Sequence, residues 1–290
     1  MKILELKLRQ WTRFRWVDCQ LNVLAECSNL SELRKASHSL PTTLEGTYDR
    51  ILSCIRREGR SDVVKLLQWL AFSVRPLTLL EMAEVFAIDR DEHRFDPNRR
   101  PRNPRAILGI CSSLVKVSNT DDYDTVSVHK SGTLSLAHLS VKEYLISEKI
   151  KNSKSFCDWH LDEKLANSAI SSDCLLYLLQ FDTVDCLRNG SEASISFGRY
   201  AAEFWITHAR SDDGVIQNDV QELVTSLLSS SGVHFNNWIT LFDMKKGCGS
   251  NSLETSYDVP HPFYYASLLG LGQIANKLLL SSSADVDIAG

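Results

Sequence analysis

The segment 125–150, TVSVHKSGTLSLAHLSVKEYLISEKI, restricts the possible fold more than any other part of the chain. In its first half apolar and polar residues alternate in two arms, whose apolar members are Val126, Val128, Leu134 and Leu136. This alternation around the turn residues 130–132 predicts a half-buried β-hairpin at about 125–138. Ser140 and Glu143 then have the spacing of a capping box, whose side chains satisfy free N–H groups at a helix start. The segment therefore predicts a hairpin that leads into a helix beginning near Ser140.

Amphipathic helices are predicted before this hairpin. Apolar residues recur at helical spacing over 14–37, 44–58, 62–72, 78–86 and 105–116. Thr42 and Thr78 each stand three residues before a glutamate, so both threonines are predicted to cap a helix. Three helices followed by a hairpin and a capped helix is the order of a winged-helix domain.

Length and composition indicate the class of protein. The 290 residues are 43% apolar and 23% charged, which is enough for roughly two domains of ~100–200 residues each. No run approaches the ~18 consecutive apolar residues of a membrane span, and charges interrupt residues 1–11, so the sequence predicts neither a membrane span nor a signal peptide. We expect a soluble, cytoplasmic protein.

Eight cysteines are scattered along the chain without a Cys-x-x-Cys pair. Most stand among apolar neighbours, which is typical of small buried side chains in a reducing compartment rather than of disulfides or a zinc site. The seven histidines other than His138 show no metal-ligand spacing either. We therefore expect no metal site and no cofactor within the chain itself.

The charge is distributed unevenly. Residues 151–290 carry 9 Lys and Arg against 17 Asp and Glu, which argues against a nucleic-acid surface there. The one concentration of arginines consists of Arg90, Arg94, Arg99, Arg100, Arg102 and Arg105. Because acids and prolines are interspersed among them, we interpret this stretch as a solvated, proline-stiffened loop. A phosphate-binding patch is the alternative.

Five blocks of the sequence carry a resemblance to a known family. They are FRWVDCQL (14–21), LPTTLEGTYDRIL (40–52), LLQWLAFSVRPLTLLEMAEVFAID (66–89), ILGICSSLVKV (107–117) and LAHLSVKEYLIS (136–147). In this order and spacing they resemble the region after the NTPase core of fungal NACHT–ankyrin proteins, which are NLR-like STAND signalling ATPases. That region includes the winged-helix domain named after GPI inositol-deacylase, and the resemblance covers about residues 14–210. It implies a regulatory domain that packs on a nucleotide-binding domain and helps to hold it closed.

The chain lacks the catalytic motifs of the proteins that it resembles. An NTPase of this family needs GxxxxGK[ST], whose backbone amides and lysine hold the phosphates, and the sequence contains no such motif. It contains no GxSxG nucleophile elbow of a hydrolase either. We therefore expect that the protein is not an enzyme, and that the chain is a fragment, or a gene model, without its N-terminal NTPase domain.

The C-terminal segment 261–290 resembles an ankyrin repeat. HPFYYA at 261–266 stands where the repeat has T-P-L-H-x-A, and ADVD at 284–287 stands where it has GADVN. A single repeat cannot bury its apolar face, and ~3 or more are normally needed. We expect the chain to end inside a longer array.

The predicted fold class is mainly α. Its four parts are a helical linker from the end of the NACHT region (1–60), a winged-helix domain with one β-hairpin (61–150), a further helical spacer (151–255) and a first or partial ankyrin repeat, present as a single helix pair (256–290).

His138 is the one candidate site residue. In STAND proteins a histidine of an M-H-D-like motif in the winged helix contacts the β-phosphate of bound ADP. Ala137-His138-Leu139 stands at the matching place, with only the histidine kept. The resemblance implies that His138 contacts nucleotide only when an NTPase domain is present. The alternative is a partly buried histidine at a strand-to-helix junction, bonded to nearby backbone.

Two classes of function remain open. The first is a non-catalytic regulatory and protein-interaction part of a STAND protein, in which the winged helix restrains the NTPase domain of a full-length relative and the repeat binds a protein partner. The second is a DNA-binding winged-helix regulator, whose recognition helix should present Arg, Lys, Asn or Gln to base edges. The predicted third helix offers only Arg105 and Lys116 around an apolar ILGICSSLV run, so nucleic acid is the less favoured partner. No membrane partner is expected.

Overall fold

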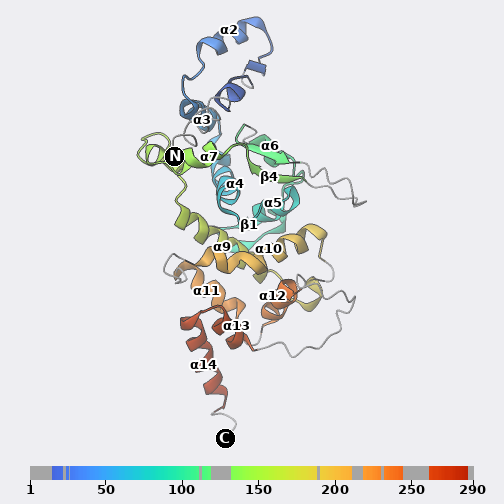
Figure 1. The fold of residues 1–290 in the computed structure, drawn as a ribbon. Helices are drawn as coiled ribbons and strands as arrows, with labels where there is room; N and C mark the ends of the chain where they lie inside the picture. Colours follow the sequence, from blue (N-terminus) through green and yellow to red (C-terminus); the bar gives the residue numbers. More distant parts are fainter. Residues whose placement is uncertain are drawn as a thin grey trace, which may run out of the picture. The chain divides into compact units, whose positions relative to one another are not determined.

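The fold is described from a computed structural model of the 290-residue chain (Figure 1). The structure describes residues 15–21, 24–25, 27–110, 113–118, 132–187, 190–210, 218–229, 232–243 and 261–286. The chain divides into two compact units. The first unit comprises Met1–Leu79 and Asn103–Glu163, and the second comprises Leu80–Arg102 and Lys164–Gly290. In the sequence, the segment Leu80–Arg102 of the second unit therefore lies between the two segments of the first.

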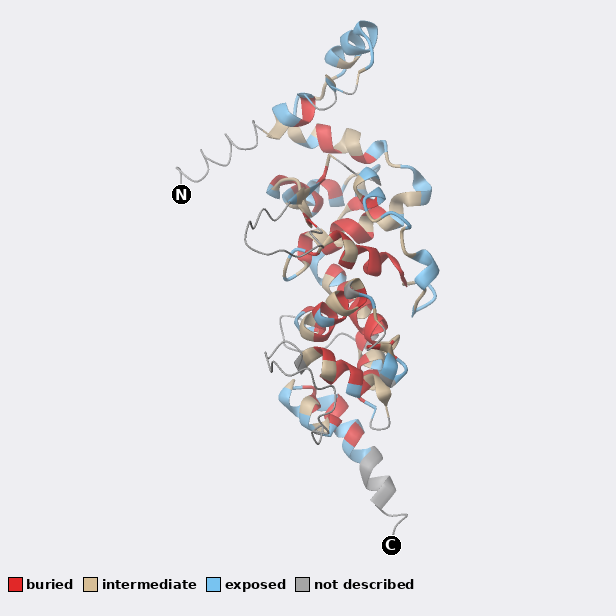
Figure 2. Ribbon diagram, turned by 90° about the vertical axis from the view of Figure 1, so that its right-hand side faces the viewer, coloured by how far each residue is buried: buried red, intermediate tan, exposed pale blue. Residues whose placement is uncertain are grey.

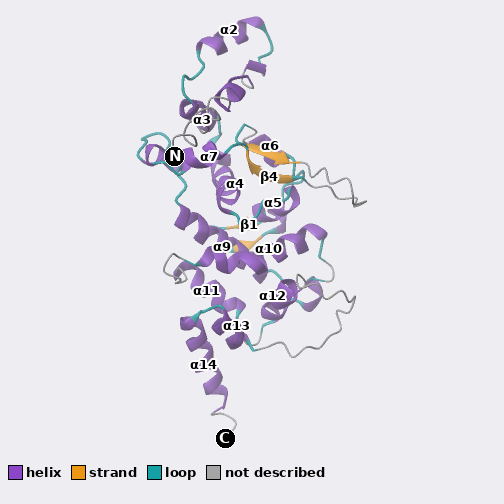
Figure 3. Cartoon of the chain, in the orientation of Figure 1, coloured by secondary structure: helices purple, strands orange, loops and turns teal. Residues whose placement is uncertain are grey.

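The described residues are mainly helical, with two short strand pairs, which confirms the predicted fold class (Figure 3). In the first unit the elements are a helix over 15–21, α2 (Leu30–His38), α3 (Leu44–Ser53), η1 (Arg57–Gly59), α4 (Arg60–Phe72), α6 (Ala106–Ile110), β3 (Val115–Ser118), β4 (Thr133–Leu136), α7 (Leu139–Leu145), α8 (Glu148–Lys151) and η3 (Cys157–Trp159). The elements of the second unit are α5 (Leu79–Phe86), β1 (Ile88–Asp89), β2 (Arg94–Phe95), η2 (Pro97–Arg99), α9 (Glu163–Leu179), η4 (Val184–Cys186), α10 (Glu192–Ala209), α11 (Asn218–Leu227), α12 (Val233–Asp243), α13 (Pro262–Leu268) and α14 (Gly272–Val286). The first residue of α5 and of α9 still belongs to the first unit.

The strand pair of the first unit includes the predicted return arm. Residues 134–136 lie in β4, which pairs antiparallel with β3 in a register that aligns Val115 with Leu136. The predicted first arm, with Val126 and Val128, lies outside the described residues. Within the described part, the partner of β4 is β3, and α4 packs against β4.

The predicted third helix is shorter than the sequence suggested. The helix α6 is described as far as Ile110, whereas Lys116 lies in β3 with an exposed side chain, so the prediction of one helix through 105–116 is wrong. Val115 and Val117 are β-branched and alternate with polar neighbours, which favours a strand over a helix.

A second, very short strand pair lies in the second unit and was not predicted. β1 and β2 pair antiparallel, with Ile88 opposite Phe95 and Asp89 opposite Arg94. His93, in the loop between the two strands, has a φ of 49°, which is unusual for a residue other than glycine. Strands of two residues contain too little alternation to be recognised in a sequence.

Two of the predicted helix starts shift by one residue. α3 is capped by Thr43 rather than by the predicted Thr42, because the Thr43 side chain accepts from the Gly46 N–H at 3.1 Å. α7 begins at Leu139 rather than at Ser140, so the prediction that Ser140 caps this helix is wrong. The reason for this second shift is part of the candidate site.

The core of the first unit is built around α4, whose buried residues include Val63, Leu66, Leu67 and Trp69 (Figure 2). The C-terminal end of α4 is closed by a cation from α7. Lys142 donates to the Ala71 carbonyl at 2.6 Å, and its ammonium group lies 4.5 Å from the centre of the Phe72 ring. A lysine at this end stabilises the helix both through the unpaired carbonyl and through the ring. By contrast, no residue of α2 is buried.

The core of the second unit is rich in aromatic side chains. Tyr177 of α9 makes edge contacts with Phe197 of α10 at 4.6 Å and with Phe95 of β2 at 5.2 Å between ring centres. Trp205 of α10 and Trp238 of α12 are both buried and lie 6.3 Å apart. Edge-to-face pairs of this kind stabilise a core beyond the area that they bury. The short strand β2 is therefore held against α9 by its aromatic residue.

The two C-terminal helices pack against each other, and α14 packs on α11. Ile274 and Leu278 of α14 are buried, whereas Leu268 of α13 and Leu280 of α14 are exposed. The ring of Tyr265 contacts Trp238 of α12 at 5.5 Å. The helix pair thus has one face on the preceding helices and leaves several large apolar side chains in contact with solvent.

His208 is a buried histidine of the second unit. Its Nε2 lies 3.0 Å from the Tyr200 hydroxyl, and its Nδ1 lies 2.8 Å from Asn167 Oδ1. Since an amide oxygen only accepts, Nδ1 carries the proton and Nε2 accepts from Tyr200. Burial lowers the pKa of His208 to about 4, so the ring is neutral in the folded protein at neutral pH.

We expect acid to destabilise the fold through His208. The unfolded chain binds this proton near pH 6.5 and the folded chain only near pH 4, so the contribution to stability is complete above pH 6.5 and is lost as the pH falls towards 4. The loss should amount to roughly 3 kcal/mol. Urea unfolding between about pH 7 and about pH 4.5 should show a steeper decrease for the wild type than for His208→Gln, which cannot titrate. Equal pH dependence of the two proteins would contradict this assignment.

Candidate functional site

His138 lies at the junction of β4 and α7 and is the N-cap of that helix. Its backbone is extended, and its Nδ1 accepts a hydrogen bond of 3.1 Å from the Ser140 N–H. The ring therefore does what a Ser or Asp side chain does at most helix starts. The side chain is partly exposed, and its Nε2 makes no hydrogen bond to any described residue. The contact with the Ser140 N–H agrees with the alternative interpretation from the sequence, a partly buried histidine at a strand-to-helix junction that is bonded to nearby backbone.

Ser140, which does not cap the helix, links His138 to α3. Its hydroxyl lies 2.7 Å from His138 Nδ1 and 2.8 Å from the Tyr48 hydroxyl. Ser140 is 6% exposed and Tyr48 is 1% exposed, so both hydroxyls have lost their contact with water. Tyr48, Ser140 and His138 form one hydrogen-bonded chain, named here the Tyr48–Ser140–His138 chain, which runs from α3 to the start of α7.

Charges around His138 favour its neutral form. Burial is the main cause that lowers the pKa of His138, and the positive charges of Arg15 and Lys116 lower this pKa further, while Glu143 opposes them. Arg15 lies in the helix over 15–21, where it donates to the Ser113 carbonyl and pairs with Asp18. A neutral ring beside a cation can donate one N–H to an anion without adding a second positive charge.

Two buried polar atoms near this junction have no hydrogen-bond partner among the described residues. They are Arg15 Nε and Gln20 Oε1. The amide of Gln20 is otherwise engaged, because its Nε2 donates to Thr47 Oγ1 at 3.0 Å and to the Pro41 carbonyl at 3.2 Å. Buried donors and acceptors are rarely left unpaired in folded proteins. The junction of the helix over 15–21, α3 and α7 therefore retains an unused donor and an unused acceptor.

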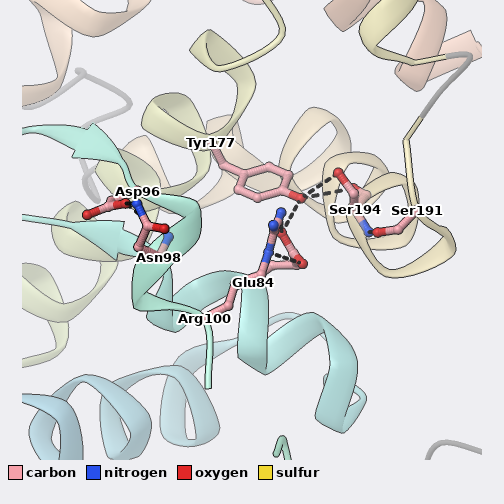
Figure 4. Close-up of polar contacts among 7 residues, drawn as sticks. All are labelled: Glu84, Asp96, Asn98, Arg100, Tyr177, Ser191 and Ser194. Carbon is pink, nitrogen blue, oxygen red and sulfur yellow. Dashed lines mark hydrogen bonds and ion pairs between the residues drawn. The ribbon is translucent and has the colours of Figure 1, made fainter. Parts of the chain in front are cut away.

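The second unit contains a larger polar cluster, which Figure 4 shows at close range. Arg100 binds Glu84 of α5 with two hydrogen bonds of 2.8 Å, and the Tyr177 hydroxyl donates to the same carboxylate at 2.9 Å. Ser194 lies beside this hydroxyl at 3.1 Å, and Ser191 caps α10 by accepting from the Ser194 N–H. Burial and the charge of Glu84 raise the pKa of Tyr177, which keeps its proton.

The arginine-rich stretch is therefore not simply a solvated loop. Arg90 also binds a buried carboxylate, Asp173 of α9, with two hydrogen bonds of 2.9 and 2.7 Å, and Asp173 is 0% exposed. The prediction is wrong for Arg90 and Arg100, because a two-bond pair of arginine with a buried carboxylate fixes the segment between them. We call residues 88–102 the strap, since these pairs tie both of its ends to the helices of the second unit.

Acidic residues within or beside apolar runs of the sequence indicate these pairs. Glu81 and Glu84 interrupt the apolar run LLEMAEVFAI of α5, and Asp173 precedes the apolar run CLLYLL of α9. A carboxylate within a run that must be buried requires a cation or donors nearby. For the Tyr48–Ser140–His138 chain the sequence offered no comparable signal, because tyrosine and serine occur on exposed and buried faces alike.

Within the described residues there is no group of three or more His, Cys, Asp and Glu side chains that could hold a metal ion. None of the helices that the structure describes is both long and apolar enough to cross a bilayer. At His138 the printed hydrogen bonds use Nδ1, and among the described residues Nε2 remains available to a ligand.

Comparison with known proteins finds similarity to one domain family and to one curated protein. Residues 48–156 match the family model of the GPI inositol-deacylase winged helix domain. The chain is also 32% identical over 269 residues to azaphilone pigments biosynthesis cluster protein L of Monascus ruber, in an alignment that covers 89% of this chain and 54% of that protein. The chain thus spans about half the length of this relative. No solved structure was found to match. The elements α4, α6, β3, β4 and α7 lie within the residues that match this winged-helix model.

We expect the Arg100–Glu84 pair to stabilise the second unit. Arg100→Ala should lower the free energy of unfolding by roughly 2–4 kcal/mol, because the buried Glu84 carboxylate loses its cation. Arg99→Ala is the matched control, since Arg99 pairs with Asp89 at the surface, and it should cost less than about 1 kcal/mol. Urea unfolding at neutral pH measures both. Equal losses for the two variants would mean that the strap is held by other contacts.

Proposed function

We propose that this chain is a non-catalytic regulatory and protein-interaction part of an NLR-like STAND signalling ATPase of the fungal NACHT–ankyrin kind. In this proposal the winged helix restrains the nucleotide-binding domain of a full-length relative. The observation that carries it is the position of His138, whose Nδ1 is occupied as the cap of α7 while its Nε2 makes no hydrogen bond to the described residues. The winged-helix match and the greater length of the Monascus ruber relative support the proposal.

The ligand proposed for His138 is the β-phosphate of ADP held by the partner domain. A neutral ring that donates from Nε2 suits a phosphate oxygen, and Arg15 supplies a positive charge in the neighbourhood. The chain itself supplies no phosphate loop, so we propose that it binds no nucleotide tightly and hydrolyses none on its own.

The proposed part played by the C-terminal helices is protein binding. We assign residues 256–290 to an ankyrin-type repeat, after a linker (1–60), a winged helix (61–150) and a helical spacer (151–255). The exposed apolar side chains of α13 and α14, such as Tyr264 and Leu268, support this assignment, because a helix pair of a repeat array offers one face to its neighbour. The same proposal includes that the protein has no enzymatic activity and is located in the cytoplasm.

The proposal is tested by binding to a nucleotide-binding domain. The probe is the separately expressed NTPase domain of a full-length fungal relative that has a Walker lysine, loaded with ADP or with a non-hydrolysable ATP analogue. We expect the 290-residue chain to bind the ADP form more tightly in calorimetry. His138→Ser keeps a capping side chain but removes the ring N–H, and it should weaken binding of the ADP form about tenfold or more, as expected for a hydrogen bond to a charged group.

The matched control is His38→Ala, which removes an exposed histidine of α2. It should leave the affinity unchanged. Equal affinity for the two nucleotide forms, or equal affinity of the wild type and His138→Ser, would refute the proposed contact.

DNA binding is the alternative function, and we expect it to be absent. The described part of α6 has five residues, and Lys116, one of two basic residues of the predicted recognition helix, lies in β3. A gel shift with mixed-sequence duplex at low salt should show no retardation, although non-specific contacts are strongest under those conditions. Salt-sensitive retardation that Lys116→Glu abolishes would instead favour the DNA-binding function.

A further inference from the structure

We propose that Tyr48 and Ser140 are positioning residues that hold the neutral ring of His138 in its Nε2–H tautomer, so that docking of α3 decides which ring nitrogen faces a ligand as a donor. That the donor of His138 would face a nucleotide rests on the proposed function. The tautomer itself does not, because it follows from hydrogen bonds inside the first unit.

One of the donors around His138 cannot reverse its direction. The backbone N–H of Ser140 can only donate, and it lies 3.1 Å from His138 Nδ1. To accept it, Nδ1 must present a lone pair, which disfavours a proton on this atom. In the neutral imidazole this contact therefore favours the proton on Nε2. Protonation of Nδ1 would also break the cap of α7.

The remaining two contacts of the chain reinforce this assignment. With Nδ1 an acceptor, the Ser140 hydroxyl donates to it at 2.7 Å and is left with a lone pair for the Tyr48 hydroxyl at 2.8 Å. Tyr48 can supply that proton, because burial raises its pKa and the phenol stays protonated at neutral pH. All three bonds thus point towards His138. Each donor polarises the next, which strengthens a buried chain of this kind.

The charged groups that face His138 do not favour the other tautomer. Arg15 from the helix over 15–21 and Lys116 from β3 are positive, and Glu143 of α7 is negative. Two cations against one anion disfavour a doubly protonated ring, which agrees with the lowered pKa. The charges therefore keep the ring neutral, and the Tyr48–Ser140–His138 chain selects the tautomer.

Tyr48 makes the selection depend on α3. This helix is tied to α7 a second time, because the Tyr144 hydroxyl donates to Asp49, and to the helix over 15–21 because Gln20 donates to Thr47. If α3 leaves, Ser140 loses the Tyr48 hydroxyl, its one hydrogen-bond partner from another helix among the described residues, and its own hydroxyl can turn and accept from Nδ1–H. The position of α3 would then be transmitted to the donor that His138 presents.

The test is ¹⁵N–¹H NMR of the full chain with labelled histidine, without nucleotide or partner. Two-bond couplings distinguish the Nε2–H from the Nδ1–H tautomer. For the wild type we expect the Nε2–H pattern at His138, assigned as the signals missing from His138→Ser. In Tyr48→Phe the ratio of Nδ1–H to Nε2–H should rise about fivefold, the effect of one neutral hydrogen bond, and in Ser140→Ala by at least as much.

Tyr144→Phe is the matched control, since it removes a hydroxyl between the same two helices that does not reach His138. Its tautomer ratio should equal that of the wild type. An Nδ1–H pattern in the wild type overturns the inference without any variant, so a variant that fails to fold does not leave it untested. A ratio unchanged in Tyr48→Phe, or changed equally in Tyr144→Phe, overturns it as well. Since no partner is present, none of these outcomes depends on whether the chain binds a nucleotide domain.

Discussion

The hydrogen bond from the Ser140 N–H to the ring of His138 is the contact on which the first unit's candidate site depends. It starts α7, and it fixes the ring between the strand and the helix. It also releases the Ser140 hydroxyl, which a capping serine would have used for itself, to meet Tyr48 of α3. A cap and a link between two helices are thus made by adjacent atoms, whereas Nε2 of the ring makes no hydrogen bond to the described residues.

The second unit is organised by buried carboxylates rather than by an exposed polar site. Glu84 and Asp173 are each held by two parallel hydrogen bonds from an arginine of the strap. Such pairs add little net stability compared with apolar packing, but removal of either partner is costly, so they fix one arrangement of the chain. The aromatic contact of Phe95 with Tyr177 acts on the same segment. Arg90 and Arg100, which were predicted to lie in a solvated loop, therefore hold the segment with β1 and β2 against the helices of the second unit.

Prediction from the sequence succeeded where a signal is local. The periodicity of α3, α4 and α5 and the return arm in β4 each depend on neighbouring residues, and the structure has these elements near the expected positions. It failed by one residue at α7, because a histidine cap resembles no standard cap in sequence. It failed for Arg90 because the partner, Asp173, is 83 residues away. The surroundings of His138 were likewise hidden, since Tyr48 lies 92 residues from Ser140.

The path of α5 has a consequence for where this protein can be cut. The winged-helix match ends at residue 156, yet residues 80–102 within that match belong to the second unit. A truncation at the family boundary would retain Glu84 and Arg90 but remove α9 and α10, and with them Asp173 and the aromatic cover of the strap. The segment that matches the family model and the compact units of the structure therefore have different boundaries. A fragment chosen by similarity alone would expose an apolar helix that carries acids meant for the interior.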